Sequence, residues 1–179
     1  MTRKEQLDFY NAHSRRLYNT SLRIVRDSGL AEEIMQDTIL KFLTGKVRIL
    51  GEAQTEAWLN KTCIRSSIDA LRRKIRDRAF LSEAKAEAKE EEAKTEAEEE
   101  IDTTGGEADL TDVKISEVMA AMSRLDEPYR LILNLILVEG LDYHEVSVLT
   151  GLKEGTIRTR YSRGRSMLLE LLGKKKKNG

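Results

Sequence analysis

Residues 140–160 of the chain read GLDYHEVSVLTGLKEGTIRTR, which has the layout of a helix-turn-helix. Asp142 and Glu145 form a D-x-x-E capping box, a pattern that begins a helix. Gly151 supplies a left-handed corner, where a β-carbon would be strained. The sequence therefore predicts a short helix, a three-residue turn and a long helix. We expect one further helix before them, in residues 118–138, which ends at a glycine-containing corner.

The long helix separates a buried stripe from a basic outer face. The inward positions, at i, i+4, i+7 and i+11, are Ile157, Tyr161, Gly164 and Leu168. The residues left outside this stripe are Arg158, Thr159, Ser162, Arg163 and Arg165. Arginines and hydroxyls on an exposed helix suit the phosphates and major-groove base edges of DNA. A helical hairpin whose arginines are simply solvated is the alternative.

Composition indicates an all-α chain. Helix formers dominate the 179 residues, Pro128 is the single proline, and no strand-like alternation lasts more than a few residues. The single cysteine, Cys63, excludes an internal disulfide and a cysteine cluster for zinc, which favours a reducing cytoplasm. The N-terminus has no signal-peptide pattern, and no apolar run approaches the roughly 20 residues that cross a bilayer. We therefore expect no membrane insertion.

The zero net charge hides a strong segregation of charge along the chain. Residues 1–81 hold 16 lysines and arginines against 10 acidic residues, and residues 110–179 hold 12 against 9. Between them, residues 82–109 hold 3 against 12 and almost no apolar residue except Ile101, so this part cannot form a packed core. We therefore expect two small helical domains, residues 1–81 and 113–172, joined by a flexible acidic linker in residues 82–112. The lysine-rich residues 173–179 are expected to be a disordered basic tail.

The first domain is predicted to contain three helices, near residues 6–26, 30–43 and 55–78. The second of these exposes an acidic and amide face, which includes Glu32, Glu33, Gln36 and Asp37. The third is strongly basic from Arg65 to Arg78 and carries the hydroxyls of Thr62, Ser66 and Ser67. Such a helix is typical of a nucleic-acid face, and a solvated helix end explains the same pattern equally well.

Five segments carry a resemblance to a known family through their order and spacing. Residues 30–39, LAEEIMQDTI, fit the pattern D-A-E-D-L-V-Q-E-T-F, and a helix led by Trp58 ends in DALRR at residues 69–73. Residues 125–133, LDEPYRLIL, fit L-P-x-x-x-R-x-V-L. Residues 139–147 and 151–160 fit E-G-x-S-Y-x-E-I-A and G-x-x-x-G-T-V-x-S-R. Over residues 6–78 and 113–172 the chain resembles a bacterial RNA polymerase sigma factor of the sigma-70 family, nearest to its extracytoplasmic-function (ECF) group.

The resemblance implies a promoter-specificity subunit that binds polymerase core, recognises the −35 and −10 promoter elements and aids DNA melting. It implies contact with the β′ clamp helices through Glu33, Gln36 and Asp37, and contact with the β flap. For the −10 element and melting it implies a role for Arg65, Ser66, Arg72 and Arg73, together with the loop in residues 46–55. For reading the −35 element it implies Arg158, Thr159, Ser162 and Arg163. It also implies an anti-sigma factor as a partner, a monomer when free, and no cofactor.

Some positions depart from the family pattern, and some alternatives stay open. Arg65 stands where the family usually has asparagine, with Ser66 and Ser67 in place of small hydrophobics, which puts the −10 specificity in doubt. The acidic linker is equally well interpreted as a mimic of nucleic acid or as a solvated spacer. A freestanding dimeric helix-turn-helix regulator has no need for the Glu33, Gln36 and Asp37 face. A protein that sequesters another factor, or is sequestered by one, remains compatible with the sigma interpretation.

The sequence offers no pattern for catalysis or metal binding. His13 and His144 are far apart in sequence, with no carboxylate or cysteine partner evident, and Cys63 is expected to serve in packing. Tyr129 and Tyr143 are expected to pack the second domain. We find no glycine-rich phosphate loop, nucleophile elbow or zinc spacing, so we expect no enzymatic activity.

Overall fold

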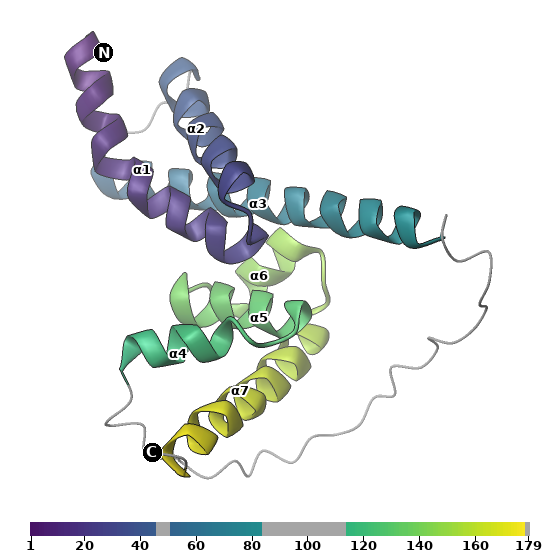
Figure 1. The fold of residues 1–179 in the computed structure, drawn as a ribbon. Coiled ribbons are helices and arrows are strands. Elements are labelled where there is room, and N and C mark those ends of the chain that lie inside the picture. Colours follow the sequence, from purple (N-terminus) through teal and green to yellow (C-terminus); the bar gives the residue numbers. More distant parts are fainter. Residues whose placement is uncertain (46–50, 84–113, 178–179) are drawn as a thin grey trace. The chain divides into compact units, whose positions relative to one another are not determined.

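The computed structural model describes residues 1–45, 51–83 and 114–177. The chain divides into two compact units, Met1–Glu90 and Glu91–Gly179 (Figure 1). Every regular element within the described residues is helical, which confirms the predicted all-α class. The predicted acidic linker lies almost wholly outside these residues, as does part of the 46–55 loop.

The first unit consists of α1 (Arg3–Val25), α2 (Ser28–Thr44) and α3 (Glu52–Glu83), which pack against one another. A capping box formed by Thr2 and Glu5 begins α1, and Arg26 ends it in the left-handed conformation, with φ of 52°. Asp27 then caps α2, so only two residues separate the helices. The shared core consists of apolar side chains from all three helices, among them Leu17, Ile24, Ile34, Ile39, Leu59, Ile64 and Ile68.

Aromatic rings join the three helices of this unit at one end. The rings of Phe9 in α1 and Phe42 in α2 stack with their centroids 4.7 Å apart. The ring of Phe42 also lies 5.8 Å from that of Trp58 in α3. Offset and tilted ring pairs of this kind contribute stability beyond the area they bury. They therefore fix α3 against the two helices that precede it.

The second unit is built from α4 (Ile115–Met122), α5 (Glu127–Leu133), a π-helical turn η1 (Asn134–Val138), α6 (Tyr143–Thr150) and α7 (Glu154–Lys177). The prediction of one helix in residues 118–138 is wrong, because residues 123–126 are not helical and separate α4 from α5. Asp126 is extended at the start of α5, and Pro128 lies in its first turn. Proline is well placed there, since its ring fixes φ and the missing N–H would have no helical partner.

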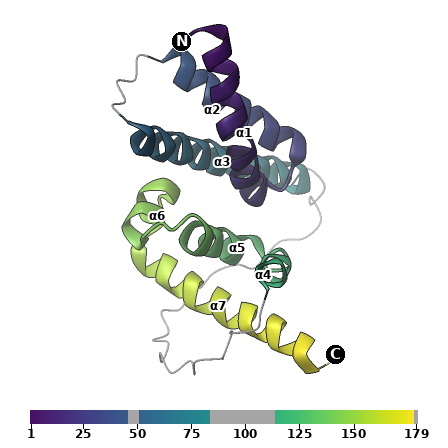
Figure 2. The same ribbon diagram turned by 90° about the vertical axis from the view of Figure 1, so that its left-hand side faces the viewer.

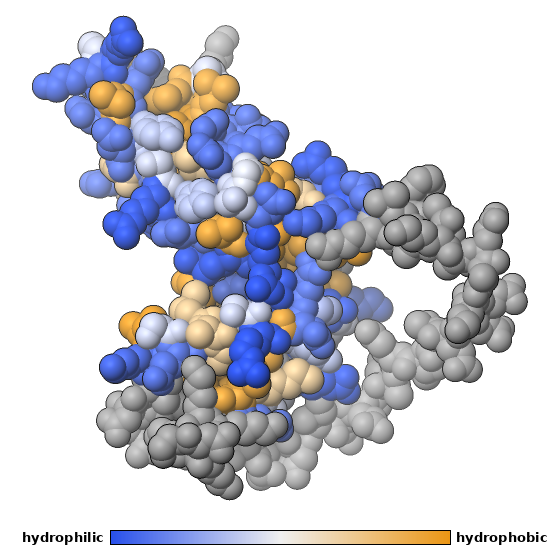
Figure 3. Space-filling view, in the orientation of Figure 1, coloured by the Kyte–Doolittle hydropathy of each residue, from blue (hydrophilic) through white to orange (hydrophobic). Residues whose placement is uncertain are grey.

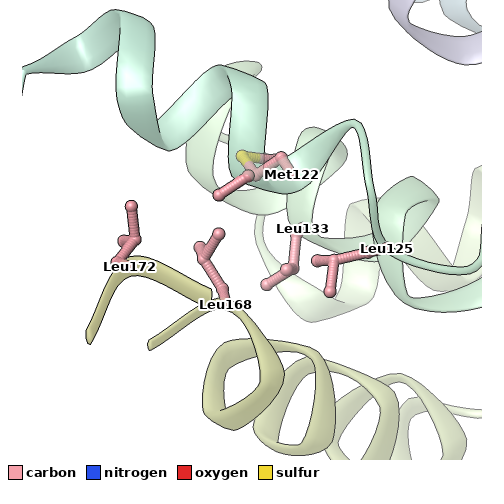
Figure 4. Close-up of a cluster of buried hydrophobic side chains, with 6 residues drawn as sticks. Met122, Leu125, Leu133, Leu168 and Leu172 are labelled. Carbon is pink, nitrogen blue, oxygen red and sulfur yellow. The ribbon is translucent and has the colours of Figure 1, made fainter. Parts of the chain in front are cut away.

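A cluster of apolar side chains fastens α4 and α5 to α7 (Figure 4). Its buried members are Ala121, Met122, Leu125, Leu133, Leu168 and Leu172. Figure 2 shows α4 and α5 lying along the same side of α7. Each fully buried leucine contributes roughly 1.5–3 kcal/mol relative to an exposed one, so this cluster contributes substantially to holding α7 in place. Outside such clusters, hydrophilic side chains cover most of the face drawn in Figure 3.

The C-terminal segment differs from its prediction. α7 runs to Lys177, so the backbone is helical in most of the stretch expected to be a disordered tail from residue 173. Two effects favour this extension. Lysine is a good helix former, and positive charges near a helix C-terminus interact favourably with the helix dipole.

Candidate functional site

The helix-turn-helix of the second unit has the local geometry that its sequence predicts. The Asp142 carboxylate accepts from the Glu145 N–H at 2.8 Å, and the Glu145 carboxylate accepts from the Asp142 N–H at 3.2 Å. Gly151 ends α6 with φ of 72°, in the left-handed region. The Ser147 hydroxyl donates to the Leu152 carbonyl at 2.7 Å, which ties α6 to the turn. The predicted capping box and left-handed corner are both confirmed.

The predicted division of α7 into a buried stripe and an outer face is also confirmed. Ile157, Gly164 and Leu168 are buried, and Tyr161 is half-buried. Among the predicted DNA-contacting residues, Arg158 and Arg163 are exposed, whereas Thr159 and Ser162 are half-buried. The Thr159 hydroxyl donates back to the Gly155 carbonyl at 3.1 Å. The arginines are therefore the members of this set with the longest reach into solvent.

Arg158 is held by two neighbouring side chains that the sequence did not single out as a site. Its guanidinium lies 5.1 Å from the centre of the Tyr143 ring, and its Nη2 lies 3.9 Å from Oε2 of Glu154. The other Glu154 oxygen, Oε1, lies 3.4 Å from Nδ1 of His144. The expectation that His144 has no carboxylate partner is therefore wrong. The short turn at residues 151–153 brings the first turns of α6 and α7 together, a proximity that sequence separation conceals.

The predicted polymerase-binding residues Glu33, Gln36 and Asp37 are all exposed on α2. The Gln36 side-chain amide donates to the Glu32 carboxylate at 3.2 Å, along the same face. α2 turns its opposite side, with Ile34, Met35 and Ile39, into the core. This face is therefore acidic and available for contact with a basic partner.

The predicted −10 residues lie on α3 with Arg65, Arg72 and Arg73 exposed and Ser66 half-buried. Ser67, expected among the exposed hydroxyls, is fully buried, so that expectation is wrong. It lies four residues after Cys63 and four before Leu71, which places it on the buried stripe of the helix. Its Oγ lies 2.9 Å from Oγ of Ser21 and 2.8 Å from the Cys63 carbonyl oxygen. Cys63 is likewise buried, as its predicted packing role requires.

A groove of about 810 Å³ joins the two predicted surfaces of the first unit. Glu33 and Asp37 line it from α2, while Ser66, Arg72 and Arg73 line it from α3. The remaining lining residues are Leu30, Ile34, Lys41, Asp69, Ile75 and Arg76. Residues with separate predicted partners thus share one groove, a proximity that follows from the packing of α2 on α3. Spacing along either helix alone does not reveal it.

Asp27 stabilises the junction between α1 and α2 and connects it to α3. Its Oδ1 accepts from the Leu30 N–H at 3.1 Å, and its Oδ2 lies 3.4 Å from Nζ of Lys74. The hydrogen bond from the Leu30 N–H, aided by Lys74, lowers the pKa of the Asp27 carboxyl. This junction positions the beginning of α2, which carries the acidic face.

The described residues offer neither a cluster of metal ligands nor a membrane-spanning helix. No group of three or more His, Cys, Asp or Glu side chains is placed to hold a metal ion within residues 1–45, 51–83 and 114–177. None of the helices described is both long and apolar enough to span a membrane.

Comparison with known proteins assigns each unit to one family. The model for Sigma-70 region 2 matches residues 9–77, and the model for Sigma-70 region 4 matches residues 115–168. The chain is 28% identical over 163 residues to the ECF RNA polymerase sigma factor SigE of Mycolicibacterium smegmatis, which covers 90% of this chain and 59% of SigE. It is also 28% identical over 167 residues to the RNA polymerase sigma factor CarQ of Myxococcus xanthus, with 93% of this chain and 88% of CarQ covered.

A solved structure shares the fold. The sigma factor RpoE, crystallised in complex with the anti-sigma factor NepR from Bartonella quintana, matches with a TM-score of 0.55 at 20% identity. The match covers 95% of this chain and 98% of the other. The two family matches follow one another in the order region 2, region 4 and take in the helices that carry every predicted surface. The chain therefore belongs to the sigma-70 family of RNA polymerase sigma factors.

Proposed function

We propose that this chain is a promoter-specificity subunit that binds RNA polymerase core and directs initiation at promoters with −35 and −10 elements. One observation carries the proposal. A single chain joins an exposed acidic face on α2, a basic face on α3 and a helix-turn-helix with exposed arginines. A freestanding duplex-DNA regulator needs the last of these and has no use for the first. The sigma-70 family consists of initiation factors, so the chain is not an enzyme, and the chemistry belongs to the polymerase.

In this proposal α7 reads the −35 element as duplex DNA. A recognition helix enters the major groove with its N-terminal part, where Arg158 and Thr159 lie in the first two turns. Ser162 follows Arg158 by four residues and Arg163 follows Thr159 by four, so these side chains extend one continuous contact strip. Exposed arginines supply bidentate contacts to guanine and charge for phosphates, while the half-buried hydroxyls supply shorter polar contacts.

The basic face of α3 serves the −10 element and DNA melting. Bases flipped from the duplex require pockets, and the displaced strand requires cations along its backbone. Arg72, Arg73 and Ser66 line the groove of the first unit. The groove supplies a pocket for a flipped base, and its arginines supply cations for the strand backbone. Arg65 lies exposed nearer the start of the same helix. Melting is assigned here to this face of residues 65–73.

Core polymerase binds the Glu33, Gln36 and Asp37 face through its β′ clamp helices, and the second unit contacts the β flap. The free protein is a cytoplasmic monomer, and an anti-sigma factor controls it. The relation to RpoE, whose solved complex contains NepR, supports this last partner. We assign residues 1–81 to core and −10 binding, 82–112 to a linker, 113–172 to −35 binding and 173–179 to a basic tail.

The test is assembly with sigma-free bacterial polymerase core, measured as co-elution on a sizing column. We expect a 1:1 complex for the full chain, and a weaker complex for the double charge reversal Glu33→Lys with Asp37→Lys. Asp8→Lys is the matched control, since it reverses an exposed charge on α1 of the same unit, away from the acidic face of α2. Elution of the protein as a dimer that binds DNA without associating with core would contradict the proposal and favour a freestanding regulator.

A further inference from the structure

Arg158 on the predicted −35 face is engaged on two sides within the second unit. The Tyr143 ring lies against its guanidinium at 5.1 Å, and the Glu154 carboxylate lies 3.9 Å from its Nη2. We call Tyr143 and Glu154 the Arg158 cradle. Tyr143 begins α6 and Glu154 begins α7, so the cradle spans the turn of the helix-turn-helix.

The cradle residues are themselves held in place by other side chains. His144 Nδ1 lies 3.4 Å from Glu154 Oε1, so each carboxylate oxygen of Glu154 has its own neighbour. The Tyr143 ring meets the ring of Tyr161 edge-on, with centroids 6.1 Å apart. Tyr161 belongs to the inward stripe of α7, so the ring that supports Arg158 is anchored to the packed side of the helix. The arginine therefore lies between two groups that have neighbours of their own, although its own side chain is 65% exposed.

The position of an arginine decides what it can read. A freely rotating guanidinium is attracted to the nearest phosphate, and this attraction is independent of sequence and strongly dependent on salt. A guanidinium fixed in orientation can meet the two acceptors of a guanine edge, a contact that depends on sequence. A carboxylate beside the arginine also opposes phosphate neutralisation, because it repels the DNA backbone.

We propose that Tyr143 and Glu154 are positioning residues that set sequence specificity through Arg158. Both act on the arginine and need no contact with a base. The inference rests on the proposed −35 role of α7. It predicts that loss of either residue lowers discrimination between sites, and that loss of Glu154 raises sequence-independent attraction to DNA.

The experiment uses the full chain bound to sigma-free bacterial polymerase core. Duplex DNA with a randomised upstream segment is first selected by the wild-type complex and sequenced. Affinity is then measured by competition for the selected duplex and for a scrambled duplex of equal composition, at several salt concentrations. The quantity compared between variants is the ratio of the two affinities, together with the slope of log affinity against log salt.

We expect Tyr143→Leu to lower the affinity ratio about two- to five-fold, the scale of an exposed cation–π contact. Tyr143→Phe keeps the ring and should keep the wild-type ratio. Glu154→Gln should lower the ratio on a similar scale, tighten binding to the scrambled duplex and steepen its salt slope. Glu170→Gln removes one charge from an exposed position elsewhere on α7 and serves as the matched control.

The decisive step repeats Tyr143→Leu and Glu154→Gln in an Arg158→Ala background. If both act through the arginine, neither should change the ratio further.

Equal losses with and without Arg158, or a loss for Tyr143→Phe equal to that for Tyr143→Leu, would assign these residues to packing and overturn the inference. If Tyr143→Leu does not fold, the two measurements on Glu154→Gln, with and without Arg158, decide alone, because the Glu154 side chain is only partly buried. Failure of the wild-type complex to select any upstream element would overturn both the proposed function and the inference, whereas selection with unchanged variant ratios overturns the inference only.

Discussion

Gly164 shows how a single missing side chain sets the packing of the recognition helix. A β-carbon at this position would lie 3.2 Å from Tyr129 Cβ and 3.2 Å from Leu133 Cδ1. Tyr129 Cβ is attached directly to the backbone of α5, so it cannot move aside as the end of a flexible side chain could. The close approach of α7 to α5 therefore depends on glycine here.

We predict that Gly164→Ala destabilises the protein by about 1 kcal/mol. Overpacking costs roughly 1–3 kcal/mol, which exceeds the helix propensity of about 1 kcal/mol that alanine adds. Gly173→Ala is the control on the same helix, since its β-carbon would meet nothing within 4 Å. That control should be neutral or stabilising. Urea unfolding followed by circular dichroism measures both, and stabilisation by both substitutions would contradict the packing argument.

Asp27 gives the first unit a dependence on acid. The pKa of its carboxyl is lowered in the folded protein, chiefly by the hydrogen bond from the Leu30 N–H and also by Lys74. A group with a lowered folded pKa adds stability above its unfolded pKa, and this stability is lost as the pH falls through the folded pKa. The contribution is therefore full at neutral pH, begins to decline near pH 4, the usual range for aspartate, and is lost as the pH falls further through the lowered folded pKa.

The corresponding prediction is that Asp27→Ala lowers the melting temperature at pH 7 and lowers it progressively less as the pH falls below the usual aspartate range. Asp27→Asn keeps a side-chain acceptor for the Leu30 N–H and removes the charge beside Lys74, so it separates the helix cap from the ion pair. Thermal unfolding at a series of pH values provides the comparison. A melting-temperature difference between wild type and Asp27→Ala that does not vary with pH would exclude the charged cap.

At the scale of helices, the sequence predicted what local chemistry determines. The capping box at Asp142 and the left-handed Gly151 are signals contained within a few residues, and both were confirmed. The sequence analysis did not predict the break between α4 and α5, although Pro128 marks it. The apolar residues on either side of the break follow the spacing of a single continuous helix. Ser67 was placed on the wrong side because the basic run of α3 obscured its position four residues from Cys63.

Contacts between helices were beyond reach from the sequence. Arg158 and Glu154 are four residues apart on one helix, a spacing that does suggest an ion pair. The neighbouring Tyr143 and His144 belong to another helix, so their proximity requires the geometry of the turn. The groove of the first unit likewise depends on how α2 lies on α3.

The buried serine pair of α1 and α3 leads to a prediction for this scale. Ser67→Ala removes one partner and leaves the buried Ser21 hydroxyl without the contact seen here, which should cost about 1–3 kcal/mol. The double variant Ser21→Ala with Ser67→Ala removes both hydroxyls and should be less destabilised than the two single effects added together. A double-mutant cycle by urea unfolding measures this coupling. Strict additivity would show that the two hydroxyls do not interact.

For the whole molecule, the proposed −35 and core-binding surfaces lie on separate units. A substitution in one surface should therefore weaken binding to its own partner only. Arg163→Ala should weaken binding of the full chain with core to a −35 duplex by about 1–3 kcal/mol if the arginine reads a base. Asp37→Ala should lower affinity for core and leave the −35 sequence preference unchanged. Core titration and DNase footprinting distinguish the two losses. An unchanged footprint for Arg163→Ala would remove that residue from the reading face.

The shared groove of the first unit has a thermodynamic consequence under the proposed function. Glu33 and Asp37 stand beside Arg72 and Arg73, so the carboxylates that attract polymerase also repel a DNA strand approaching those arginines. Polymerase that covers the carboxylates removes this repulsion, and by linkage a bound DNA strand raises the affinity for polymerase by the same factor.

Glu33→Gln with Asp37→Asn should then change the two affinities of the full chain in opposite directions, weakening core binding and tightening single-stranded DNA binding without core. Asp8→Asn removes an exposed charge from α1 of the same unit, away from the groove and from the acidic face of α2, and should leave both nearly unchanged. Assembly with polymerase and promoter opening would in that case be thermodynamically coupled. The affinity of the free protein for single-stranded DNA would be low and would rise when polymerase binds.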